Sequence, residues 1–388
     1  MKASTDIFEL VNSLTKAEKG YFRRHSGIDT KGSSTKYNLL FDAINRQKEY
    51  NEKKLLDQFK HEPFTRQFPV AKSYLYDRIL TSLDSCHDSS YETIRHYLHQ
   101  AEILFEKGLY KQALRIILKA KKITLDLELF IFLPEILQWE HSIAHEKLDF
   151  KKRVLILNEY KQALSLLENV RIFHLLSARM ALIVQRYGQE GKPKYFGQIK
   201  SILKHPVLKN VSKAHSFSAK TKFYYLHSAY WYLQKNYSKA FGLFEKEFSL
   251  YENNFEKITL FFHGYISCLY NILAVCLKLK NYTAVEKYLK IIKSAPSVIK
   301  NHTHRARLFH GYSNYFTDYI IALGQFYRAQ EIIPEILKEF RIYESEMNPN
   351  EKTFLLSNIA IIWFGNQEYS KCLFYLNKIR NEFFLNIK

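Results

Sequence analysis

Apolar residues recur along this chain at the spacing of amphipathic helices. The stretch from residue 101 to residue 124, AEILFEKGLYKQALRIILKAKKIT, shows the pattern clearly. It predicts one helix, a tight break at Gly108, and a second helix that opens at Tyr110. Such spacing places the apolar side chains on one face of each helix, where a neighbouring helix can cover them. The chain is therefore predicted to be all-α and built from helical hairpins.

Residues 1–90 lack this regular punctuation and are predicted to be a separate N-terminal helical unit. A short helix is expected over residues 5–12. The spacing of Thr15 and Glu18 is that of a capping box, which predicts a second helix ending near His25. Further helices are expected after Thr35, after Asn51 and at Pro69. We expect this unit to cap the repeats that follow or to add a second contact.

From residue 91 onward, the hairpin pattern returns at a nearly constant period. The aromatic residues that open the second helices are Tyr110, Phe150, Tyr195, Tyr237, Tyr282, Phe326 and Tyr369. Their spacings are 40, 45, 42, 45, 44 and 43 residues. A fixed period of two helices is typical of a solenoid, in which each unit buries its faces against its neighbours. Residues 91–388 are therefore predicted to be a repeat domain of about seven helix pairs with a period of about 43.

A small or β-branched residue follows most of these aromatics by three positions. In the five strongest units it is Ala113, Ala240, Val285, Ala329 or Cys372. A small side chain at a helix crossing lets the two backbones approach closely. The openings YKQA from residue 110 and YSKA from residue 237 resemble those of tetratricopeptide repeats. The resemblance implies a right-handed superhelical α-solenoid whose concave groove is lined by the first helices.

The resemblance covers more than half of the chain, and three features depart from it. The period is longer than that of the family, which predicts longer helices. The units at Phe150 and Tyr195 have Arg153 and Gln198 where the small residue belongs. Pro334 falls inside a second helix and is expected to kink it. The N-terminal SLTKAEKGYFRRH also resembles uncharacterised bacterial repeat proteins, which implies no activity.

Composition favours a cytoplasmic protein. Gly (12) and Pro (8) are scarce, which disfavours an all-β fold with many tight turns. Four cysteines lie far apart without a CxxC pair, so a reducing compartment is expected; they are Cys86, Cys268, Cys276 and Cys372. Cys268 and Cys276 are interpreted as small core residues. The sequence offers neither a signal peptide nor 18 uncharged apolar residues in a row, so no membrane span is predicted.

Motifs for catalysis and for resident cofactors are missing from the sequence. It contains no GxxxxGK[ST], no GxGxxG after a strand, no HExxH and no GxSxG. His141 and His145 lie one helical turn apart beside carboxylates, a geometry that can chelate a metal. Two ligands do not make a site, and helical histidines at this spacing are commonly incidental. We therefore expect a protein that is not an enzyme and that binds no cofactor or metal.

The net charge of +20 is concentrated in one third of the chain. Residues 191–317 hold 20 Lys and Arg against 5 Asp and Glu, whereas residues 1–90 hold 15 against 12. The first-helix positions implied by the tetratricopeptide resemblance predict the partner-binding residues Lys220, Lys222, Tyr225, Tyr232, Tyr270, Lys278, Asn314 and Asp318. Lysine with tyrosine suits an acidic peptide, a C-terminal carboxylate or stacked single-stranded nucleic acid. The alternative is that the lysines form a solvated basic face on the convex side.

Two functions from different classes follow. In the first, the protein is a non-catalytic scaffold whose groove grips an acidic protein or peptide segment, with no small-molecule substrate. In the second, it is a nucleic-acid-linked regulator, through the basic repeats or through a helix-turn-helix-like N-terminal unit. The reading helix of that unit would carry Lys72, Ser73, Tyr76 and Arg78. The low charge of residues 1–90 and the gap of about eight residues before Pro69 disfavour the second function.

Overall fold

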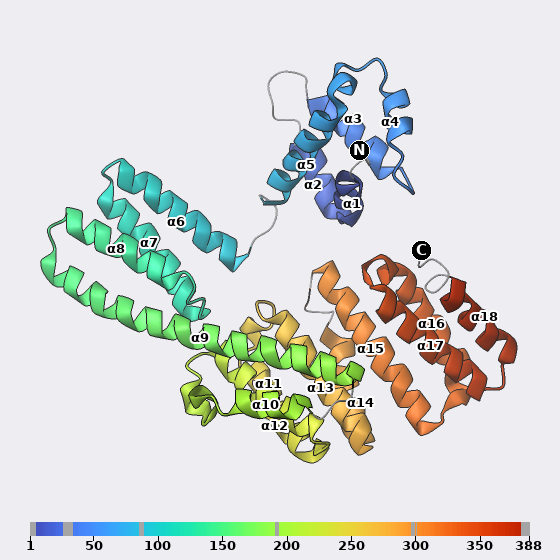
Figure 1. Ribbon diagram of the computed structural model, residues 1–388. Coiled ribbons are helices and arrows are strands. Elements are labelled where there is room, and N and C mark those ends of the chain that lie inside the picture. Colours follow the sequence, from blue (N-terminus) through green and yellow to red (C-terminus); the bar gives the residue numbers. More distant parts are fainter. Residues whose placement is uncertain are drawn as a thin grey trace. The chain divides into compact units, whose positions relative to one another are not determined.

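The computed structural model describes residues 5–25, 34–84, 89–190, 194–295, 299 and 301–381. Over these residues the chain folds into α-helices joined by turns and short 3-10 helices, and it forms no strand (Figure 1). The all-α prediction is confirmed. The chain divides into two compact units, Met1–Ile103 and Leu104–Lys388. Because this division falls inside α6 (Ser90–Glu106), the predicted domain boundary after residue 90 stays a prediction.

The first unit packs short helices around one core. They are α1 (Asp6–Ser13), α2 (Lys16–His25), α3 (Ser34–Asn45), α4 (Glu52–Gln58) and α5 (Phe68–Asp84). The core is centred on large apolar side chains such as Phe22, Phe41 and Leu75, all almost fully buried. The predicted capping box is present, because the Glu18 amide donates to Thr15 Oγ1 at 3.3 Å and the Thr15 amide donates to Glu18 Oε2 at 2.7 Å. The local signals of the sequence therefore place these helices correctly.

The second unit continues from α6 as a series of helices that pack on their neighbours in the sequence. They are α7 (Tyr110–Asp126), α8 (Leu133–Glu146), α9 (Phe150–Glu190), α10 (Lys194–Leu203), α11 (Phe217–Leu233), α12 (Tyr237–Glu252), α13 (Phe262–Leu279), α14 (Tyr282–Ser294), α15 (His302–Leu323), α16 (Ala329–Tyr343), α17 (Pro349–Gly365) and α18 (Tyr369–Ile379). Five predicted aromatics are the first residues of α7, α9, α12, α14 and α18. Tyr195 is the second residue of α10, and Phe326 opens a 3-10 turn that leads into α16. The aromatic positions thus predict where these helices begin.

The turns before these aromatics share one backbone geometry. Two residues before the aromatic, φ is positive at Gly108, Leu148, Lys235, Lys280, Gly324 and Gln367. The next amide donates back to the carbonyl five residues earlier, as from Leu109 to Leu104 at 2.9 Å and from Asn281 to Cys276 at 2.9 Å. This is the Schellman ending of a helix, in which a left-handed residue lets the chain satisfy the last carbonyls. Only two of the six left-handed residues are glycines, so the turns repeat in geometry more strictly than in sequence.

The long helix α9 corrects the predicted hairpins at Phe150 and Tyr195. A second helix opening at Phe150 and the first helix of the next unit were expected as separate helices. They are instead fused into α9, a helix of 41 residues, which Figure 1 shows running without a break. The physical reason is that no Gly or Pro occurs between Phe150 and Tyr187, so nothing stops the helix. The first half of α9 packs on α8 and the second half packs on α10 and α11.

The predicted small residues lie in the core of the second unit. Ala113, Ala240, Val285 and Ala329 are fully buried, and Cys372 is 7% exposed. Cys268 and Cys276 are buried, unpaired core residues, as expected, whereas Cys86 lies outside the described residues. Pro334 stands inside α16, which continues through it from Ala329 to Tyr343. The helices α11, α13, α15 and α17 alternate with these second helices and present the side chains considered next.

Candidate functional site

Five of the eight predicted partner-binding residues line one cavity, here called the α13–α15 cavity. It has a volume of about 700 Å³. The five are Tyr232 from α11, Tyr270 and Lys278 from α13, and Asn314 and Asp318 from α15. Glu351 and Phe354 of α17, together with His310 and Tyr315 of α15, complete the wall. Offsets counted from the aromatics therefore bring these five side chains to one place.

A close approach between α13 and α15 shapes the floor of this cavity. The Tyr270 ring lies directly over Gly311, and a Cβ atom at that position would collide with the ring. The Tyr270 hydroxyl donates to the carbonyl of Arg307. Any larger residue at position 311 would therefore push Tyr270 out of place, so the glycine fixes the separation of the two helices.

The polar end of the α13–α15 cavity offers acceptors and a cation. Asn314 is 5% exposed, and its Oδ1 has no hydrogen-bond partner in the part of the chain that the structure describes. Asp318 Oδ1 accepts from Nδ2 of Asn358 at 2.9 Å. Burial raises the pKa of the Asp318 carboxyl, while that hydrogen bond and the charge of Lys278 oppose the rise. Lys278 is exposed and makes no ion pair with any described residue, so its ammonium group is available to a ligand.

Lys222 and Tyr225 line a second cavity, here called the α9–α13 cavity, with a volume of about 610 Å³. Its walls come from α9, α11, α12 and α13, and include His174, Glu247 and Tyr251. Lys220 is exposed on α11 and lines neither cavity. Of the eight predicted residues, five therefore line the α13–α15 cavity, two line the α9–α13 cavity, and Lys220 lines neither.

Sequence reasoning missed Glu247 and His174. Glu247 lies on α12 among the core residues Phe244, Phe248 and Tyr251, and it is 4% exposed. A carboxylate on the apolar face of a helix was a detectable signal, because charged groups are rarely buried without a partner. His174 could not be placed, because the second half of α9 was expected to be a different helix.

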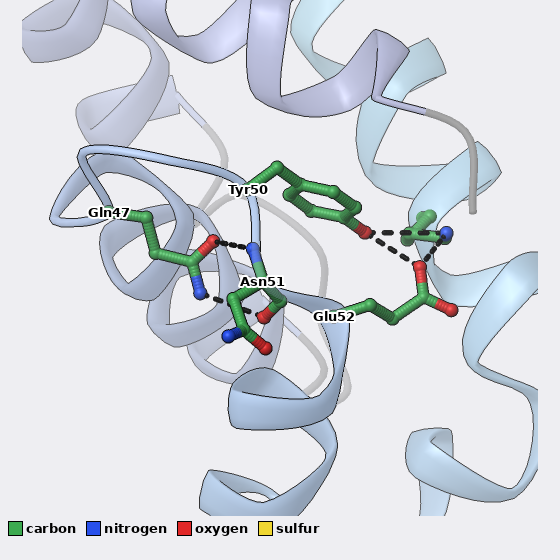
Figure 2. Close-up of polar contacts among 5 residues, drawn as sticks. Gln47, Tyr50, Asn51 and Glu52 are labelled. Atoms are coloured by element: carbon green, nitrogen blue, oxygen red, sulfur yellow. Dashed lines mark hydrogen bonds and ion pairs between the residues drawn. The ribbon is translucent and has the colours of Figure 1, made fainter. Parts of the chain in front are cut away.

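The N-terminal residues of the alternative hypothesis are partly engaged in their own unit. Lys72 Nζ donates to Glu52 Oε2 at 2.5 Å, and the Tyr50 hydroxyl donates to the same oxygen at 2.8 Å. Figure 2 shows the side chains of Tyr50 and Glu52 directed toward each other, beside the hydrogen bonds that join Gln47 to Asn51. Burial opposes ionisation of Glu52, but the hydrogen bonds from Lys72 and Tyr50 outweigh it and lower its pKa.

The remaining residues of that hypothesis are divided between the core and the surface. Tyr76 packs against the apolar core of the first unit, and the Arg78 guanidinium lies 5.9 Å from the centre of the Tyr74 ring. Ser73 is exposed. Since Lys72 and Tyr76 make contacts within the first unit, few of the four side chains on α5 remain free to contact the bases of a nucleic acid.

Two further features concern metal ligands and membrane spans, neither of which the sequence predicts. Among the described residues, no three His, Cys, Asp or Glu side chains are grouped to hold a metal ion, and His141 Nε2 lies 3.4 Å from Arg153 Nε. Among the helices that the structure describes, α13 alone is long and apolar enough to span a membrane by length and composition. Half of that helix is buried inside the second unit, where it supplies core residues such as Leu269 and Ile272.

Searches against protein-family models and against curated proteins find no match for this sequence. The residues and their geometry are therefore the basis for assigning a function.

Proposed function

We propose that this protein is a non-catalytic, cytoplasmic scaffold whose α13–α15 cavity holds an acidic segment of a partner protein. The second unit, with the α6 hairpin before it, would be a tetratricopeptide-like right-handed solenoid of about seven helix pairs. The shared backbone geometry of the turns before six aromatics supports a repeat of this kind. The N-terminal unit would cap the array or add a second contact.

The observation that carries the proposal is the convergence of five side chains from three helices on one cavity. The tyrosine rings of Tyr232 and Tyr270 offer large, stiff contact surfaces, which are enriched where proteins bind partners. Asn314 offers an unused acceptor to a peptide N–H, and Lys278 offers a cation to a carboxylate. The excess of 15 positive charges over residues 191–317 favours acidic partners during encounter.

Selection from a library of displayed 12-residue peptides tests the proposal on the full chain. We expect the enriched peptides to carry net negative charge and to bind with an affinity that falls with salt concentration. Lys278→Glu should weaken binding by about tenfold, since it replaces an attraction by a repulsion in the cavity. Lys290→Glu is the matched control, because this substitution makes the same change in net charge. Lys290 is exposed on α14 and lines no cavity described above.

Enrichment of neutral or basic peptides, or equal losses in the two variants, would contradict the acidic-partner proposal. A single-stranded 20-nucleotide DNA measured beside the peptides tests the alternative. Tighter binding of the oligonucleotide than of any enriched peptide would favour the nucleic-acid function instead.

A further inference from the structure

The α9–α13 cavity holds a lysine and a glutamate that do not touch each other. Lys222 comes from α11 and Glu247 from α12, and both line the same space. Neither forms an ion pair with any side chain that the structure describes. An ammonium group and a carboxyl group that line one cavity without a hydrogen bond between them can both face a third group.

Glu247 is an isolated carboxyl group deep in the unit. It is 4% exposed, and its Oε2 atom has no hydrogen-bond partner among the described residues. Burying a carboxyl group without a partner is costly, so such groups in proteins are commonly protonated or matched by a ligand. The Lys222 ammonium group has only a weak partner, because its hydrogen bond to Ser218 Oγ is 3.4 Å long. Ser218 Oγ lies in turn 3.4 Å from Nε2 of His174.

The rest of the wall combines polar side chains such as Ser177 and Asn271 with an apolar part that can hold the ring or chain of a small molecule. Tyr225, Tyr251 and Phe261 supply aromatic surface, and Ala178 and Ala181 supply small apolar positions on α9. Gly264 leaves space for the Tyr251 hydroxyl, which a Cβ atom at position 264 would meet. A volume of about 610 Å³ falls in the range of cavities that bind small ligands.

We propose that the α9–α13 cavity binds the carboxylate of a small aromatic or aliphatic acid, held between the Lys222 ammonium and the Glu247 carboxyl group. The ammonium supplies a charge-assisted hydrogen bond to one carboxylate oxygen, and protonated Glu247 donates to the other. The ring or chain of the acid lies against Tyr225 and Phe261. This site is distinct from the α13–α15 cavity, so the proposal goes beyond the scaffold function and does not depend on it.

The titratable groups around Glu247 favour an anion over an amine. These groups are His174 from α9, Lys222 and Tyr225 from α11, Tyr251 from α12, and His263 and Cys268 from α13. Burial raises the pKa of Glu247 to about 8, although Lys222 opposes the rise. Burial and the charge of Lys222 lower the pKa of His174 to about 4. At neutral pH the Glu247 carboxyl group is therefore protonated and the His174 imidazole is neutral, so neither offers a negative charge to an amine.

Three probes that share one ring test the charge of the ligand on the full chain. Phenylacetate, phenethylamine and L-phenylalanine are compared by ligand-observed NMR and by calorimetry at pH 7. We expect phenylacetate to bind with a dissociation constant on the order of 1 mM, as suits a ligand of its size. The amine and the zwitterion should bind at least about tenfold more weakly, because each brings a cation to Lys222.

Variants identify the groups that hold the carboxylate. Lys222→Met should weaken phenylacetate binding by at least about tenfold, whereas Lys220→Met, on the same helix but outside the cavity, should leave it unchanged. Glu247→Gln should keep binding at pH 7, because its amide still donates, and should remove the loss of binding that the wild type shows above about pH 8. Circular dichroism checks that each variant keeps its helices.

A second pair of probes distinguishes a free acid from the end of a polypeptide. N-acetyl-Gly-Gly-Phe is compared as the acid and as the amide. Binding of the acid as tight as that of phenylacetate assigns the carboxylate to a chain end, and binding of phenylacetate alone assigns it to a free acid. The proposal is overturned if no probe binds at 10 mM, or if phenethylamine binds best and Glu247→Gln abolishes its binding.

Discussion

Two clusters in the second unit each contain lysine and glutamate, but only one of them forms ion pairs. In the first, Lys121 Nζ lies 2.6 Å from Glu140 Oε2 and 2.8 Å from Glu159 Oε2, which joins α7, α8 and α9. In the second, Lys222 and Glu247 face a cavity without meeting. Glu140 and Glu247 are almost equally buried, at 2% and 4% exposed. Burial alone therefore does not distinguish a structural ion pair from a binding site, but the presence of a partner does.

The pKa of Lys121 is raised and that of Lys222 is lowered, in line with this difference in partners. For Lys121, burial alone would lower the pKa, but the hydrogen bonds to Glu140 and Glu159 outweigh it and raise the pKa. For Lys222, burial lowers the pKa, and the attraction of the ionised form of Glu247 opposes this only in part. The first cluster is complete in the protein alone, whereas Lys222 and Glu247 form no ion pair with any described side chain.

Of the two lysine substitutions, the one that breaks the complete cluster should have the larger effect on stability. Lys121→Met leaves Glu140 buried without its closest cation, since Lys152 Nζ is 3.8 Å away. We expect the free energy of unfolding to fall by about 3 kcal/mol, as for other buried pairs that lose one partner. Urea unfolding followed by circular dichroism measures the change. Lys122→Met, at an exposed neighbouring position, is the control and should change it by no more than about 0.5 kcal/mol. An equal loss in both variants would show that Lys121 has no special role.

Removing the lysine of the incomplete cluster should have the opposite sign. Lys222→Met replaces a partly buried cation that lacks an ion pair by an apolar side chain of similar length. We expect the ligand-free protein to gain about 1 kcal/mol in unfolding free energy, because the desolvation of the charge is no longer a cost. The same urea experiment measures it. A loss above about 1 kcal/mol would mean that Lys222 supports the fold and would weaken the comparison.

The pH dependence of stability tests the protonation of Glu247 through the direction in which stability changes with pH. The carboxyl of Glu247 has a pKa of about 8 in the folded chain and an ordinary value near 4.5 when unfolded. The folded chain therefore holds this proton more tightly, so its contribution to stability is full below pH 4.5 and is lost as pH rises toward 8. Between pH 5 and 8, the wild type should lose stability relative to Glu247→Gln, as measured by urea unfolding at each pH. Parallel profiles for the two proteins would show that Glu247 is ionised throughout.

The helices were predictable wherever the chain carries local signals. Tyr110, Tyr237 and Tyr369 begin second helices because a small residue three positions on lets that helix pack closely, and the spacing repeats. The left-handed turn residues were not predictable in the same way. Leu148 and Gln367 adopt positive φ although a side chain disfavours it, because the packing of the two helices around the turn dictates the backbone there.

The candidate sites were predictable only in part. Fixed offsets on the first helices located Tyr270, Asn314 and Asp318, because those helices are regular and share one register. Glu247 and His174 come from a second helix and from the fused helix α9, for which the offsets give no position. The cavity around Lys222 therefore depends on tertiary packing that the period of the sequence does not encode.

The most direct test of the scaffold function is site-specific photocrosslinking in the native host. Tyr232, in the α13–α15 cavity, is replaced by p-benzoylphenylalanine in one variant, and Tyr327, which is 73% exposed on the turn before α16, is replaced in the other. The account predicts a discrete crosslinked partner protein with an acidic crosslinked segment at position 232 and none at position 327. Crosslinks of equal yield at both positions, or only at position 327, would contradict it.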